Sequence, residues 1–214
     1  MTGLQKTVAL CLGFVAVVVG LFVYSVTRTP VLSEEQLREQ GVFILPRPRE
    51  IAPIELETHT GAPFTLEDLT GHWTFAFFGF THCPDVCPTT LAVMGEARRM
   101  LGSGDTFQGI LVSVDPERDD AETLAAYTTA FSPDFVGVRG SREAVAAFAE
   151  QVNVAFAKVP VTNENGQPDP DNYQVDHTAN IVIINPRGHY HGFIKYPQQA
   201  DTIVAAYQSL SANF

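Results

Sequence analysis

Two cysteines, Cys83 and Cys87, are the residues of this chain best suited to chemistry. With a step of four residues, part loop and part helical turn, their sulfur atoms can lie within a few ångströms of each other. Such a pair can hold one metal ion, form one disulfide, or do both at different times. Pro88 suits the first position of a following helix, which places Cys87 near the N-cap, where the helix dipole favours thiolate.

A histidine far along the sequence, His177, could complete a metal site with this pair. We expect it at the start of a central strand, from which it could reach the cysteines across the top of the domain. Soft thiolates with imidazole suit copper or zinc, and two cysteines with one histidine suit Cu(I), with room for a further ligand in Cu(II). Asp176 is a candidate acceptor for the other imidazole hydrogen.

The segment 115–119 (DPERD) follows a predicted buried strand, so its tip should lie near the same edge as the cysteines. We interpret it as a turn and helix cap with a salt bridge from Arg118. The alternative is that Asp115 acts as an electrostatic partner close to the metal.

The remaining histidines are interpreted as solvated side chains; the alternative is a metal pair of His189 and His191, which would share one strand face. Met94 and Met100 are single helix residues, which excludes a methionine-rich copper site. The histidines lie in predicted turns or next to one; they are His59, His72, His82, His189 and His191.

Hydrophobic periodicity predicts the elements that must position these residues. Apolar runs of strand length alternate with amphipathic patterns of helix length, which indicates a layered α/β domain with a partly parallel sheet. The cysteines follow the most apolar run, at the carboxyl end of a strand, where open α/β sheets place ligands. Residues 153–176 form an extra hairpin-like insertion. The expected strands are 54–56, 64–66, 73–80, 107–114, 136–138, 155–161, 181–184 and 191–194, and the expected helices are 33–40, 88–101, 120–131, 141–152 and 198–210.

The amino-terminal segment is predicted to be a membrane anchor. Residues 7–27 carry no charge, and as a helix they would be about 31 Å long, against a hydrocarbon core of about 30 Å. The run is too long for a cleaved signal peptide and lacks a small-residue cleavage site. Cys11 is interpreted as an apolar side chain within it. We therefore assign residues 1–28 to one transmembrane helix, 29–50 to a proline-containing stalk and 51–214 to the globular domain.

The charge balance excludes one class of partner. All 24 acidic residues and 11 of the 13 basic ones follow Arg28, so residues 29–214 carry a net charge of −13. Nucleic-acid binding depends on Lys and Arg that neutralise phosphates, so it is not expected.

Three cysteines are too few for a disulfide scaffold. Basic residues on both sides of the apolar segment do not settle its orientation.

Three spaced motifs resemble the Sco/SenC family of copper proteins: THCPDVCPTT (81–90), VDPERD (114–119) and VDHTANIVIINP (175–186). The resemblance implies a thioredoxin-like fold with an added hairpin. It also implies binding of copper, as Cu(I) or Cu(II), through Cys83, Cys87 and His177, and thiol redox activity of the two cysteines.

The same resemblance implies a metallochaperone that assists assembly of the binuclear copper A centre of cytochrome c oxidase, as copper donor, thiol reductant or both. Its partners would be oxidase subunit II or another copper-receiving protein, and a periplasmic copper donor. The location implied is the bacterial inner membrane, crossed once, with the carboxyl-terminal domain in the periplasm.

The alternative is an enzyme, a thiol-disulfide oxidoreductase or thiol peroxidase that uses Cys83 and Cys87. Peroxidases of this fold have threonine three residues before the reactive cysteine, where this chain has Pro84, and dithiol oxidoreductases prefer two intervening residues. His177 discriminates between the two classes, because a copper site needs it and a redox enzyme has no evident use for it. The sequence therefore favours a non-enzymatic copper protein.

Overall fold

The computed structural model describes residues 3–27, 31–102, 106–162 and 168–214. The chain divides into two compact units, residues 1–31 and 32–214. The first consists of helix α1 (Gly3–Thr27), on which apolar side chains such as Leu10 and Phe14 are 77% and 69% exposed. Over the described part of the chain, no helix is long and apolar enough to cross a membrane. The predicted anchor therefore stays a prediction.

An eight-stranded mixed sheet forms the centre of the second unit, in the order β1-β10-β9-β4-β5-β6-β2-β3. Strands β4, β5 and β6 are parallel, as the alternating pattern predicts, and the outer strands pair antiparallel. The strands are β1 Val42–Glu50, β2 Leu56–Thr58, β3 Pro63–Phe64, β4 Trp73–Gly79, β5 Phe107–Ser113, β6 Val136–Arg139, β9 Ile181–Ile184 and β10 His189–Ile194. The predicted strand at 64–66 ends early, because Leu66–Leu69 turn into a 3-10 helix.

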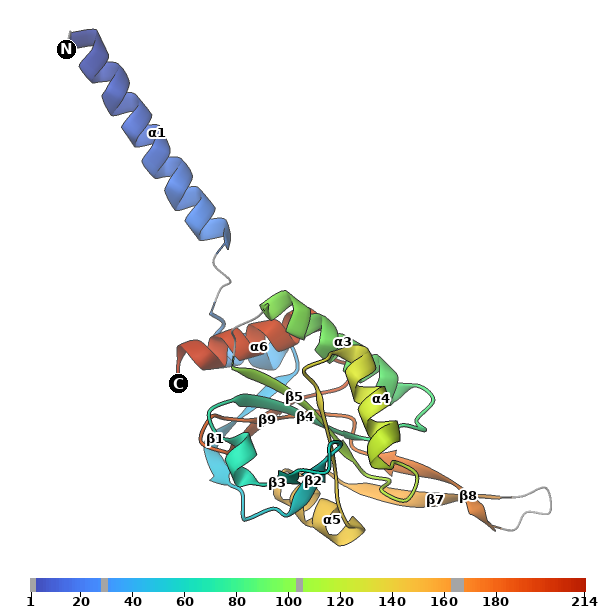
Figure 1. Cartoon of the computed structure of the whole chain (residues 1–214). Helices are drawn as coiled ribbons and strands as arrows, with labels where there is room; N and C mark the ends of the chain where they lie inside the picture. The colour runs from blue at the N-terminus through green and yellow to red at the C-terminus, as the bar shows by residue number, and fades with distance from the viewer. Residues whose placement is uncertain (1–2, 28–30, 103–105, 163–167) are drawn as a thin grey trace. The chain divides into compact units, whose positions relative to one another are not determined.

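Helices cover both faces of this sheet (Figure 1), with α3 and α6 on one face and α5 on the other. Every residue of β4 is buried, as expected for a central strand covered on both faces. Phe78 of β4, for example, packs against Phe148 of α5 with ring centroids 5.3 Å apart. The helices are α2 Glu34–Glu39, α3 Val86–Leu101, α4 Ala121–Phe131, α5 Arg142–Gln151 and α6 Ala200–Ala212.

The expected stalk at 29–50 is wrong for its described part, because residues 32–50 belong to the folded unit. Helix α2 begins at a capping box in which Ser33 and Gln36 exchange hydrogen bonds. Strand β1 pairs with β10 along one edge of the sheet, and its register shifts between Ile44 and Arg49. Proline is excluded from helix interiors, but an edge strand with a bulge tolerates it, so Pro46 and Pro48 fit in β1.

The predicted insertion is a separate two-stranded hairpin, β7 (Phe156–Thr162) with β8 (Pro168–His177), which projects beyond the sheet (Figure 1). Strand β8 begins at Pro168, and residues 163–167 lie outside the described residues. His177 is the last residue of β8 rather than part of the central strand, which begins at Ile181. The hairpin strand therefore carries the histidine to the site.

Candidate metal centre

A buried carboxylate holds the loop that carries the first cysteine. Asp119 is fully buried and accepts hydrogen bonds from the backbone amide and the hydroxyl of Thr81, the hydroxyl at 2.6 Å. It also accepts one from Ser113 at the end of β5, at 2.6 Å. Asp120, not Asp119, caps α4, so Asp119 is free to tie the loop after β4 to the end of β5. Charge-assisted hydrogen bonds of this kind give the loop a defined path.

Helix α3 begins two residues earlier than predicted. Its first residue is Val86 and its N-cap is Asp85, so Cys87 and Pro88 lie inside the first turn. The side chain of Asp85 does not cap the helix; instead the amide of Cys87 donates to Sγ of Cys83 at 3.4 Å. The sulfur of Cys83 therefore occupies the position of an N-cap acceptor, facing the positive end of the helix dipole.

The two thiols have opposite acidities. The hydrogen bond from the thiol of Cys87 lowers the pKa of Cys83 to about 3, against some desolvation, with help from His177 and from the backbone amides of Asp85 and Cys87. The same hydrogen bond, together with burial, raises the pKa of Cys87 well above its ordinary value. The sequence-based expectation that Cys87 is the favoured thiolate is therefore wrong: Cys83 is partly exposed and ionised, whereas Cys87 is fully buried and keeps its proton.

His177 presents one ring nitrogen to the cysteines. Its Nδ1 lies 3.2 Å from the carbonyl oxygen of Thr178, which can only accept, so Nδ1 carries a hydrogen. The other ring nitrogen, Nε2, faces Sγ of Cys87 at 3.5 Å. The edges of Phe77 and Phe80 pack against the imidazole, with centroids 5.6 and 5.9 Å away. Both the tautomer and the orientation of the ring are thus suited to metal ligation through Nε2.

The ligand atoms of Cys83, Cys87 and His177 all lie within 4.8 Å of one another and form a group able to hold a metal ion. Two thiolate sulfurs and one imidazole nitrogen are soft and borderline donors, the combination that selects copper or zinc over magnesium or calcium. The three residues that the sequence predicted as ligands are therefore brought together.

A buried glutamine connects the two sides of this group. Gln198 donates to the carbonyl oxygen of Ala179 at 2.8 Å, and its side-chain oxygen accepts from Thr90 of α3 at 3.5 Å. Thr90 lies one turn after Cys87, and Ala179 lies two residues after His177. Gln198 therefore links the helix of the cysteine to the segment of the histidine, a role that no local sequence pattern indicates.

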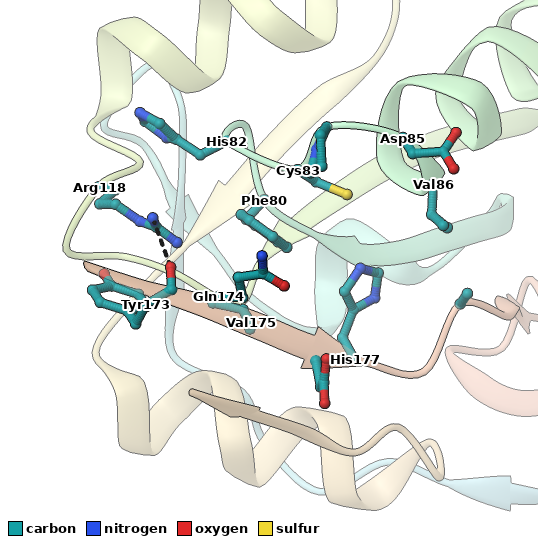
Figure 2. Close-up of a pocket in the computed structure, with 13 residues that line it drawn as sticks. Phe80, His82, Cys83, Asp85, Val86, Arg118, Tyr173, Gln174, Val175 and His177 are labelled. Atoms are coloured by element: carbon teal, nitrogen blue, oxygen red, sulfur yellow. Dashed lines mark hydrogen bonds between the residues drawn. The ribbon is translucent and has the colours of Figure 1, made fainter. Parts of the chain in front are cut away.

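The group opens into a cavity of about 520 Å³. Figure 2 shows Cys83 and His177 on its wall near Phe80, while His82 points away from them. Its lining residues are Phe80, His82, Cys83, Pro84, Asp85, Val86, Arg118, Tyr173, Gln174, Val175, Asp176, His177 and Ala179. The cavity gives solvent, or a partner, access to the ionised sulfur of Cys83.

Asp176 does not accept the imidazole hydrogen, and Asp115 has a partner within its own turn. The Nδ1 hydrogen of His177 faces the Thr178 carbonyl rather than Asp176, because neighbouring strand residues point to opposite faces. Asp115 is fully buried and pairs with Arg118, which agrees with the salt bridge expected for this turn. Phe80, Asp119 and Gln198 support the site and were missed, because their roles depend on contacts between distant segments.

Two of the other histidines have structural partners. His191 packs edge-on against Trp73 with centroids 5.0 Å apart and lies 3.1 Å from the Asn185 amide nitrogen. His59 accepts from the amide of Gly137 at 2.8 Å. The expectation that these two side chains are merely solvated is therefore wrong, because each is partly buried and has a partner within the fold.

Comparisons with known proteins show what the chain is similar to. The family model described as SCO1/SenC matches residues 45–212. The human mitochondrial SCO1 homolog is 34% identical over 175 residues, which cover 80% of this chain and 56% of the human protein. The chain thus spans little more than half the length of that relative.

Solved structures agree with the mixed α/β, thioredoxin-like architecture. Apo Sco1 from Thermus thermophilus is 35% identical with a TM-score of 0.70, over 79% of this chain and 96% of that one. ScoI from Bradyrhizobium japonicum, solved with copper bound, is 32% identical with a TM-score of 0.65, over 74% and 98%. A protein similar to this one therefore holds copper.

Proposed function

Because this chain belongs to the SCO1/SenC family, we propose that it binds one copper ion through Cys83, Cys87 and His177 and passes it to another protein. The observation that carries the proposal is the mutual approach of the three ligand atoms within 4.8 Å. Copper is here the cargo rather than a resident cofactor. A partly exposed thiolate at Cys83 offers the first contact with an incoming ion, and loss of the Cys87 proton completes the sulfur pair.

The receiving protein in this proposal is subunit II of cytochrome c oxidase, or another protein with a copper A site. A periplasmic donor supplies the copper, and residues 7–27 anchor the chain in the bacterial inner membrane with residues 32–214 on the periplasmic side. The uncharged character of residues 7–27 and the family resemblance support this arrangement.

Copper titration of the chain and its His177→Ala variant tests the site. We expect one Cu(II) per chain, with thiolate-to-copper absorption. The affinity of the variant should fall by more than the roughly 10- to 100-fold that loss of an outer partner of a ligand causes, because a ligand itself is removed. His82→Ala is the matched control, because His82 lies next to Cys83 but points away from it. Equal affinities in His177→Ala and the native chain would refute the ligand assignment.

The same variants, tested in cells that lack the native protein, probe the biological role. Cys83→Ser and Cys87→Ser should each abolish copper loading of the oxidase, because either change removes a sulfur ligand. Cys11→Ser should have no effect, since Cys11 lies on α1 in the other compact unit. Normal oxidase copper content with Cys83→Ser would overturn the delivery role.

The acidity of Cys83 supports a second candidate function, reduction of disulfides in the target protein. The ionised, cavity-facing Cys83 can attack one sulfur of a target disulfide, which releases the first target thiolate and leaves a mixed disulfide. Cys87, on losing its proton, then attacks the sulfur of Cys83 and displaces the second target thiolate as the Cys83–Cys87 disulfide forms. Each turnover oxidises this dithiol and reduces one target disulfide. His177→Ala separates the two functions, because it should weaken copper binding and leave this exchange intact.

A further inference from the structure

Five side chains fasten the β7–β8 hairpin to the loop after β5, and copper delivery as described above makes no use of them. They are Asp115, Glu117, Arg118, Lys158 and Tyr173, and we refer to them as the hairpin clamp. The first three belong to the loop after β5, and the last two belong to β7 and β8.

Arg118 and Tyr173 form the centre of the hairpin clamp. The guanidinium carbon of Arg118 lies 4.0 Å from the ring centroid of Tyr173, and Nη1 donates to the Tyr173 carbonyl oxygen at 3.3 Å, as Figure 2 shows. The Tyr173 hydroxyl donates to the buried Asp115 at 2.7 Å, and Asp115 also pairs with Arg118. Side-chain and backbone groups of one β8 residue are therefore held by two residues of a single loop.

Lys158 adds a connection from β7. Its amine lies 4.2 Å from the Tyr173 ring centroid, on the strand that pairs with β8, and it forms an ion pair with Glu117. The ring of Tyr173 is thus in contact with two cations. Both strands of the hairpin are tied to the same loop.

The hairpin clamp is connected to the candidate metal centre through β8 and through Phe80. Tyr173, Val175 and His177 alternate along β8 and share one face, on which Val175 is buried. Phe80 lies between the hairpin clamp and the metal centre: its ring centroid is 5.7 Å from the Arg118 guanidinium and 5.9 Å from the imidazole of His177. A shift of β8 would therefore move Nε2 of His177 relative to both sulfurs.

We propose that the hairpin clamp positions His177 for copper, by holding β8 in the register that keeps Nε2 within reach of Cys83 and Cys87. Arg118 and Tyr173 are positioning residues that act through the strand and do not contact the metal. The two cysteines belong to the loop after β4 and to α3, so their backbone positions are set outside the hairpin. The inference rests on the proposed copper site and assigns a role to the 115–118 segment.

Two variants of the full chain test the inference. Tyr173→Phe removes the hydrogen bond from the hydroxyl to Asp115 but keeps the ring. Arg118→Lys keeps the positive charge but loses the planar guanidinium, whose N–H groups donate to Asp115 and to the Tyr173 carbonyl. We expect each to weaken Cu(II) binding about 10- to 100-fold, the usual effect of losing an outer partner of a metal ligand. Nitrogen hyperfine coupling in the Cu(II) paramagnetic resonance spectrum should weaken as well. The reaction rate of Cys83 with a disulfide reagent should stay unchanged.

Tyr207→Phe is the matched control, because it also removes a partly buried hydrogen bond of a phenol hydroxyl. That hydroxyl accepts from the Thr106 amide at 3.1 Å, at the opposite end of β5. Native Cu(II) affinity and nitrogen coupling in Tyr173→Phe would overturn the inference even if Arg118→Lys failed to fold. His177→Ala is measured in parallel. If His177→Ala weakens binding and both hairpin clamp variants match Tyr207→Phe, only the positioning role fails; if His177→Ala also binds normally, the proposed site itself is wrong.

Discussion

The sulfur of Cys83 should react with an aromatic disulfide reagent at a rate that hardly changes between about pH 5 and pH 8, since its lowered pKa leaves it ionised throughout. The cause is the hydrogen bond from Cys87, which lowers the pKa of Cys83 from 9.0 to about 3. A thiol with a pKa of 9.0 is about 1% ionised at pH 7 and about 0.01% ionised at pH 5, so its rate rises about tenfold per pH unit.

The low pKa also makes each thiolate less reactive. Nucleophilicity follows the pKa with a Brønsted slope of about 0.4–0.5, so a fall from 9.0 to about 3 slows each thiolate roughly 500-fold. Combining both effects, Cys83 should react about 20-fold faster than an ordinary thiol at pH 5 and about fivefold slower at pH 7, with equal rates near about pH 6.3. Partial burial of Cys83 lowers its absolute rate and leaves the pH profile flat.

The assay measures release of the reagent's chromophore from metal-free, reduced protein by stopped flow. Cys11→Ser removes the third thiol, and Cys87→Ser leaves Cys83 as the reacting group while keeping a hydroxyl that can donate to it. Cys87→Ala removes this donor, so the pKa of Cys83 should rise and a pH-dependent rate should return. A tenfold increase per pH unit in the Cys87→Ser protein would refute the reasoning. An equally flat profile in Cys87→Ala would show that the donor is not the cause.

Two further predictions concern packing around the site. In Gly79→Ala the added methyl would lie 3.0 Å from Sγ of Cys87, so we expect a loss of about 1–3 kcal/mol in unfolding free energy; an unchanged urea midpoint would contradict it. Gln198→Ala should leave the Ala179 carbonyl without its donor, cost about 1–3 kcal/mol and weaken copper binding in titration. Gln108→Ala is the control, because Gln108 is a partly buried glutamine that accepts a hydrogen bond from Thr74 of β4 at 2.7 Å. It should lower stability without weakening copper binding. Equal copper affinities in the two variants would count against the bridging role of Gln198.

Local patterns were sufficient for most of the fold. The uninterrupted apolar run of β4 and the amphipathic helix after it predict a strand-to-helix junction, and the structure has one there. The prediction failed at β1, where Pro46 and Pro48 were taken as signs of a stalk. Those prolines exclude a helix but not an edge strand, and only the position of β1 beside β10 shows which applies.

The sequence by itself identified the three candidate ligands, because residue types and spacing suffice to recognise soft metal donors. It could not tell which cysteine is ionised. That depends on Cys83 lying at the amino end of α3 and accepting hydrogen bonds, while Cys87 is buried against β4. Acidity depends on surroundings that differ between two chemically identical thiols, and those surroundings exist only after folding.

The path of His177 to the site was likewise decided by tertiary structure. Adjacent in sequence to a central strand, it nevertheless ends a hairpin strand that Arg118 and Tyr173 hold in place. Asp119 and Gln198 contribute through hydrogen bonds to residues 38 and 19 positions away in the chain. Sequence periodicity reports which face of an element is buried, but not which distant partner it meets. The residue types therefore determine which chemistry the chain can perform, and long-range contacts determine the geometry of the site.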